Sequence, residues 1–146
     1  MIIENIIGRH DEERTTGKQT ETVSFEWFER DKRILKKVSS SGKEIGLRLS
    51  EPLFDGAILY EDGNRVIILS LTECEIIRIS VSSMREMGRA CFELGNRHLP
   101  LSIGDDHVET PYESPTLAYL SHLGFDCAKT VGKFLPSVTV RGHSHG

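Results

Sequence analysis

The stretch "CEIIRISVSSMREMGRACFELGNRHLPLSI", residues 74–103, predicts a strand, a helix and a second strand in succession. Its first eight residues, "CEIIRISV", have the apolar content of a strand. Ser83 and Glu86 then have the spacing of a capping box, in which each side chain bonds the other residue's backbone at a helix start. Apolar side chains follow at three- and four-residue steps, and we expect them to face the core. They are Met84, Met87, Cys91 and Leu94.

The residues after this stretch predict a hairpin, a second helix and a last strand. Residues 99–112, "LPLSIGDDHVETPY", have two strand-like runs around an acidic turn. Ser114 and Pro115 are typical of the N-cap and first position of a helix, which Gly124 would end. The residues expected to line this helix are Leu117, Leu120 and Leu123. Residues 126–140 can supply a last strand. The order is therefore βαββαβ, the ferredoxin-like arrangement in which two helices cover one face of a four-stranded sheet.

The first half of the chain has strand signals and no helical period. The expected strands include "VSFEWF" (23–28), "ILKKV" (34–38), "IGLRLS" (45–50), residues 2–7, and a hairpin at 57–71 around Asp62-Gly63-Asn64, with a loop at 11–22. We predict an α+β chain. It has a small N-terminal all-β domain (1–73), a ferredoxin-like metal-binding and dimerisation domain (74–138) and a flexible tail (139–146).

Composition excludes several classes of partner. The formal net charge is -4, with 18 Lys and Arg against 22 Asp and Glu, so no basic footprint for nucleic acid or an anionic membrane is present. The N-terminus has neither a signal-peptide pattern nor a membrane span, and we expect a cytoplasmic protein. Its three cysteines, 74, 91 and 127, lie far apart and are expected to be small packing residues.

His98 and the two tail histidines are the residues that could carry chemistry. His98 lies just past the expected helix end near Gly95, where an imidazole can either complement the helix dipole or bind a metal. His143 and His145 alternate in the glycine-bounded ending "RGHSHG", and imidazole suits nickel, copper and zinc. We expect structural or surface roles for the other histidines examined, His10, His107 and His122, and expect Asp106 and His107 to point to opposite faces of a strand.

A shared site follows if these histidines act together. One imidazole on a monomer surface binds metal poorly, but a two-fold axis near His98 would bring two of them together. The tails could then complete the ligand shell. No thiolate or suitably spaced acidic residue accompanies them, so the residues favour a reversible metal binder without activated water.

The chain resembles the UreE family of urease accessory proteins. The residues that carry the resemblance are "RILKK" with "DGAILYEDGNRVIIL" in the first half, "MREMGRACFELGNRHLPLSI" in the second, and the tail "RGHSHG". The resemblance implies a nickel metallochaperone that delivers Ni(II) for assembly of the urease active site, and that also binds Zn(II) or Cu(II) in vitro. It implies His98 as a metal ligand at a dimer interface, and His143 and His145 as tail ligands.

The resemblance also implies partners. These are a second copy of the chain, the urease accessory GTPase, other urease accessory proteins and the apo-urease complex, with the N-terminal β domain engaging the accessory proteins. The two tail histidines are fewer than in many relatives, so we expect one principal site per dimer. The alternative function is a protein-interaction scaffold whose histidines are incidental. An enzyme is not expected, because no nucleophile elbow, phosphate loop or HExxH stretch is present.

Overall fold

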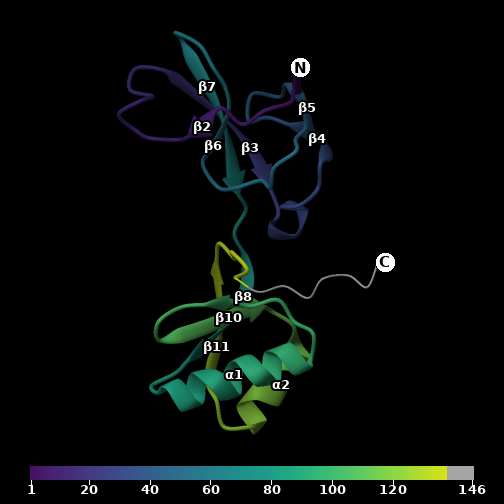
Figure 1. Ribbon diagram of the computed structural model, residues 1–146, viewed down its shortest axis with the longest axis vertical. Coiled ribbons are helices and arrows are strands. Elements are labelled where there is room, and N and C mark those ends of the chain that lie inside the picture. Colours follow the sequence, from purple (N-terminus) through teal and green to yellow (C-terminus); the bar gives the residue numbers. More distant parts are fainter. Residues whose placement is uncertain (138–146) are drawn as a thin grey trace. The chain divides into compact units, whose positions relative to one another are not determined.

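The computed structural model describes residues 1–137 (Figure 1). The chain divides into two compact units, Met1–Thr72 and Glu73–Gly146, which we call the N-terminal and C-terminal units. None of the helices among the described residues is long and apolar enough to cross a membrane.

The N-terminal unit is built from strands, as its sequence predicts. Its elements are β1 (Ile2–Ile3), β2 (Gly8–Arg9), β3 (Gln19–Phe25), the 3-10 turn Trp27–Glu29, β4 (Ile34–Val38), β5 (Glu44–Arg48), β6 (Ala57–Glu61) and β7 (Arg65–Leu71). They form one sheet in the order β1-β5-β4 and another in the order β2-β6-β7-β3. Alternating apolar residues from β3, β5, β6 and β7 form a shared core, so both sheets bury one face.

Three sequence expectations for this unit are wrong in their bounds. The strand expected at residues 2–7 is limited to Ile2–Ile3. The predicted loop at 11–22 is shorter, because β3 begins at Gln19 and pairs in parallel with β7 from Arg65 onward. The polar residues of "QTET" gave no strand signal of their own; the parallel pairing comes from a neighbour far away in sequence. Likewise "VSFEWF" does not continue as a strand, since Trp27–Glu29 forms a 3-10 turn.

The C-terminal unit has the predicted βαββαβ order. Its elements are β8 (Cys74–Ser80), α1 (Met84–Asn96), β9 (Ser102–Ile103), β10 (His107–Pro111), α2 (Ser114–His122) and β11 (Asp126–Gly132). The strands form an antiparallel sheet in the order β11-β8-β10-β9. Side chains of both helices pack with Ile77, Ile79 and Val108 in one core. The ferredoxin-like prediction is confirmed.

The first turn of α1 follows the capping pattern with one shift. The Ser83 hydroxyl accepts a bond from the Glu86 amide at 3.1 Å, while the Glu86 carboxylate accepts from the Ser82 amide, one residue earlier than expected. Met87 and Cys91 contact the core and Leu94 is buried in it. Met84 was expected beside them, and this is wrong: its side chain is 91% exposed. It occupies the first helical position, and the helical period alone does not say how far the core extends.

The two ends of α2 fit the sequence differently. Glu113, not Ser114, is the N-cap, and its carboxylate accepts a bond from Thr116 at 2.5 Å. The helix thus starts one residue earlier than the serine suggested, with Pro115 still in its first turn. At the other end Gly124 terminates it, as predicted, with φ +91°.

The segment after β11 crosses the sheet. Gly132 ends the strand at one edge, and five residues later the Ser137 amide donates to the Leu101 carbonyl at 2.8 Å beside β9, the opposite edge strand. The Ser137 hydroxyl also accepts from the Ile103 amide at 3.0 Å. Phe134, in the middle of the crossing, is completely buried. The last described residue is therefore fastened to the edge of β9.

Candidate metal centre

His98 lies at a well-defined helix end. Arg97 is the C-cap of α1, and the His98 amide donates to the Gly95 carbonyl at 2.9 Å. The Leu99 amide donates to the Leu94 carbonyl at 3.0 Å. These two bonds define a Schellman motif with His98 at the C′ position. The histidine side chain is exposed, while Leu99 packs against the core.

The backbone of His98 is strained. Its φ is +59°, and among residues 1–137 it is the only non-glycine residue with a positive φ. The left-handed conformation costs an ordinary L-residue roughly 1–2 kcal/mol, which is why glycine is the usual residue here. The end of α2 has the same motif, with the Phe125 amide bonded to the Leu120 carbonyl, and there the equivalent residue is Gly124. The chain thus keeps a histidine where glycine would be more stable.

The residue before His98 is also fixed. The Arg97 guanidinium carbon lies 4.3 Å from the centroid of the Tyr119 ring on α2. The Tyr119 hydroxyl donates to the Glu93 carboxylate on α1 at 2.8 Å, and this hydrogen bond raises the pKa of Tyr119. The sequence did not indicate this network, because its members are separated by up to 26 residues. The one feature of this network that is visible in the local sequence is that an arginine directly precedes the candidate ligand.

Within residues 1–137, no three His, Cys, Asp or Glu side chains lie close enough together to hold a metal ion. Among these residues, His98 therefore has no cluster of further candidate ligands around it. His143 and His145, the predicted tail ligands, lie outside the described residues.

Of the other described histidines, His10 and His107 bond to protein groups and His122 is exposed. His10 Nε2 lies 3.0 Å from the Thr15 hydroxyl, and His122 is exposed in the last turn of α2. His107 corrects one expectation. Its Nδ1 lies 2.8 Å from the Asp106 carboxylate and its Nε2 lies 3.1 Å from the Arg78 guanidinium. Asp106 belongs to the turn before β10, so strand alternation does not separate the two side chains.

Cys91 offers no thiolate to this site. Cys91 faces the core of α1, its thiol lies 3.9 Å from the Met87 sulfur, and burial raises its pKa. A raised pKa keeps the thiol protonated and therefore a poor metal ligand.

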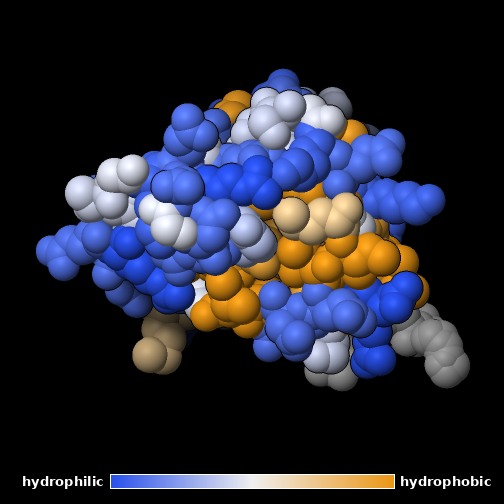
Figure 2. All heavy atoms as spheres, turned by 90° about the horizontal axis from the view of Figure 1, so that it is seen from above, coloured by the Kyte–Doolittle hydropathy of each residue, from blue (hydrophilic) through white to orange (hydrophobic). Residues whose placement is uncertain are grey.

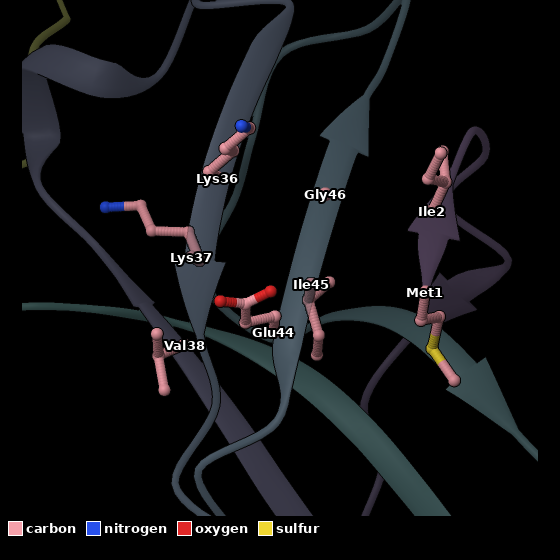
Figure 3. Close-up of a pocket in the computed structure, with 8 residues that line it drawn as sticks. All are labelled: Met1, Ile2, Lys36, Lys37, Val38, Glu44, Ile45 and Gly46. Atoms are coloured by element: carbon pink, nitrogen blue, oxygen red, sulfur yellow. The ribbon is translucent and has the colours of Figure 1, made fainter.

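The N-terminal unit has a surface groove of about 320 Å³ on its three-stranded sheet. Figure 3 shows its lining: Lys36, Lys37 and Val38 from β4, Glu44, Ile45 and Gly46 from β5, and Met1 and Ile2 at the other side. Figure 2, which is seen from above in the view of Figure 1, shows hydrophobic residues exposed among hydrophilic ones. The groove therefore combines apolar side chains with two lysines and one glutamate.

Comparison with known proteins gives the family. Residues 3–72 match the family described as UreE urease accessory protein, N-terminal domain, and residues 74–146 match its C-terminal domain. The chain belongs to the UreE family. Urease accessory proteins UreE from Acetivibrio thermocellus and Lysinibacillus sphaericus are 35% and 38% identical to it, each over 99% of this chain and over 97% and 100% of their own lengths.

A longer UreE relative shares part of its length with this chain. The urease accessory protein UreE of Bifidobacterium longum subsp. infantis is 41% identical over 88% of this chain, which spans 58% of that protein. The two UreE domain matches meet at residue 73, where the chain also passes from one compact unit to the other.

Proposed function

We propose that this protein is a nickel metallochaperone that carries Ni(II) for assembly of the urease active site, with His98 as its central ligand. The observation that supports this role is the positive φ of His98. A histidine that only complemented the helix dipole could occupy a relaxed position in the last turn, whereas a strained, exposed imidazole favours a functional reason for its retention. Membership of a family of urease accessory proteins supports a role in urease maturation, and an imidazole ligand suits nickel.

The protein acts as a homodimer in this proposal, because one imidazole is too few ligands. The outward face of α1 supports a self-complementary contact. Met84 and Phe92 on this face are 91% and 68% exposed. Gly88 lies between them and Gly95 follows Phe92 by three residues, and both glycines have open space where a Cβ would project. Glycine inside a helix costs about 1 kcal/mol relative to alanine, and here it lets a second helix approach closely. A two-fold axis along this face would bring two copies of His98 together.

The tail histidines complete the ligand shell in this proposal. The last described residue, Ser137, is bonded to Leu101, which lies three residues after His98 in the chain. His143 follows Ser137 by six residues, and six residues can span at most about 20 Å. The start of the tail on the β9 edge supports His143 and His145 as additional ligands. An all-imidazole site also binds Zn(II) and Cu(II) in vitro, since affinity follows the usual order of these ions.

The N-terminal unit engages the partners in this proposal: the urease accessory GTPase, other accessory proteins and the apo-urease complex. Its groove borders the free edge of β4. Ser39 donates to Lys43 and Leu49 donates to Arg33, so odd-numbered residues of β4 bond to β5. The backbone N–H and C=O groups of the even-numbered residues therefore point away from the sheet, where an extended segment of a partner can pair. These residues are Ile34, Lys36 and Val38.

Nickel titration of the full chain tests the assignment. Replacing His98 with Ala removes the central ligand from both copies, so the tightest site is lost. Replacing His143 and His145 together weakens nickel binding but leaves the central pair able to hold the ion. His122→Ala, an exposed histidine on α2, is the matched control and binds as wild type does. Isothermal titration gives affinity and stoichiometry for each variant.

The same titration distinguishes the alternative function. An interaction scaffold with incidental histidines predicts weak nickel binding that is equal in wild type and His98→Ala. That result would return His98 to a structural role at the helix end. In that case nickel would not change the affinity of the protein for its partners. We expect no catalytic activity from either function.

A further inference from the structure

Arg97 presents an electrostatic difficulty for a metal centre at His98. A guanidinium is always protonated, and this one belongs to the residue adjacent to the proposed ligand. A positive charge about 8 Å from a divalent ion in water weakens its binding roughly fivefold. In a dimer with His98 near the axis, two Arg97 side chains would repel one ion. A freely moving Arg97 therefore opposes the proposed function.

The structure shows where the guanidinium is held. Its carbon lies 4.3 Å from the centroid of the Tyr119 ring, so it rests against α2. An arginine over an aromatic face gains a cation–π attraction. This attraction favours the observed position of the exposed Arg97 side chain over its other conformations. The ring in turn is oriented by its hydroxyl, which donates to Glu93 at 2.8 Å. Both Tyr119 and Glu93 are half-buried, which limits their freedom to move.

We infer that Tyr119 is a positioning residue of the metal centre: it holds the Arg97 guanidinium against α2 and so keeps its charge from an ion bound at His98. Glu93 fixes the orientation of the Tyr119 ring. The inference rests on the proposed nickel site. It adds that affinity depends on a side chain of α2 that supplies no ligand.

The test compares nickel affinity and thermal stability in four forms of the full chain: wild type, Tyr119→Leu, Arg97→Gln, and the double variant. Tyr119→Leu frees both copies of Arg97, and we expect a loss in nickel affinity of roughly fivefold per guanidinium, up to about 25-fold for the dimer, that grows as salt is lowered. The double variant has no charge to release, so its affinity returns to the wild-type value or above. Its melting temperature does not recover, because the packing of the ring is still missing. Tyr119→Phe keeps the ring but loses the bond to Glu93, and we expect a smaller loss than for leucine.

The outcomes separate this inference from the nickel assignment. If wild type binds nickel and Tyr119→Leu binds it equally well, the positioning role is overturned and the nickel site stands. If the affinity loss persists in the double variant and follows the melting temperature, Tyr119 is only structural and the inference is also overturned. If wild type itself binds no nickel, the proposed function fails and the inference fails with it.

Discussion

His98 occupies a backbone position at which function and stability oppose each other. Both helices of the C-terminal unit end in the same hydrogen-bonded motif, one with glycine and one with histidine at the left-handed residue. The comparison with Gly124 is internal to the chain, so solvent, fold class and motif are matched. The side chain of His98 costs free energy in the folded state and is exposed, which supports the proposed binding role.

Exchanging the two residues tests this cost. We expect His98→Gly to raise the free energy of unfolding by roughly 0.5–1 kcal/mol, because the relief of strain exceeds the added freedom of the unfolded chain. The same variant loses its tightest nickel site. The reciprocal change, Gly124→His, lowers the free energy of unfolding by roughly 1–2 kcal/mol. Denaturant titration of both variants measures these differences; a loss of stability in His98→Gly would contradict the assignment of strain.

Among the elements, the hairpin of β6 and β7 has the most specific local chemistry. The Asp62 carboxylate accepts bonds from the Asn64 and Arg65 amides, at 2.7 and 2.9 Å, and from the Tyr60 hydroxyl at 2.8 Å. These bonds favour the charged carboxylate and lower the pKa of Asp62 from 3.8 to about 2. The turn is thus stabilised by the ionised form of a single side chain.

The stability from Asp62 depends on pH with a definite sign. A folded pKa below the unfolded value contributes stability above about pH 4, and the contribution is lost as pH falls toward 2. We expect Asp62→Asn to be less stable than wild type near neutral pH, and the difference to shrink in acid. Unfolding measured at about pH 6 and about pH 2 checks this. Asp31→Asn, a change at an exposed aspartate of the same unit, is the control for the loss of one carboxylate.

At the scale of the whole molecule, the proposed metal centre forms only if two copies of the chain associate. The exposed methionine, phenylalanine and two glycines of α1 lie on the face that leads toward His98. A monomer gains nothing from Gly88, since a Cβ there would meet no atom within 4 Å. A dimer gains a close approach of two helices at that point.

Substituting this glycine separates the two states. In a monomer, Gly88→Ala stabilises α1 by about 1 kcal/mol through helix propensity. In the proposed dimer it weakens association, because two added methyl groups meet at the contact. Sedimentation should therefore show more monomer for Gly88→Ala than for wild type. Gly63→Ala, a change at another glycine with open space around it, leaves the association unchanged. A wild-type protein that sediments only as monomer, with or without nickel, would remove the shared site.

The pH dependence of nickel affinity reports how many histidines bind one ion. Each ligand must be neutral, and histidine in general has a pKa of about 6.5, so affinity falls as pH drops through that region. Two central histidines and at least one tail histidine per chain make the fall steeper than a single titration. Measurements between about pH 5.5 and 8 should give more than one proton released per ion. A flat profile, or a slope of one proton or fewer, would contradict a multi-histidine centre.

Features that depend on neighbours along the chain follow from residue type and spacing alone. The Ser83 cap, the turn at Asp62 and the glycine stop at 124 are set by backbone hydrogen bonds spanning a few residues, so residue type and spacing predict them. The order of strands and helices follows from these signals, and so does the ferredoxin-like arrangement. The sequence also singled out His98, because an exposed histidine after a helix end is a local feature.

The surroundings of His98 depend on contacts between elements that are distant in the sequence. The strained φ of His98 depends on where α1 ends and on the packing of Leu99 in the core. The position of the Arg97 guanidinium depends on its contact with Tyr119 from α2. The burial of Phe134 and the attachment of Ser137 to β9 join residues more than 30 positions apart. Met84 is exposed for the same kind of reason: a helical period gives the direction of a side chain, and the sheet beneath decides how far the core reaches. Contacts of this kind come from strand pairing and helix packing across the unit, which no short stretch of sequence encodes.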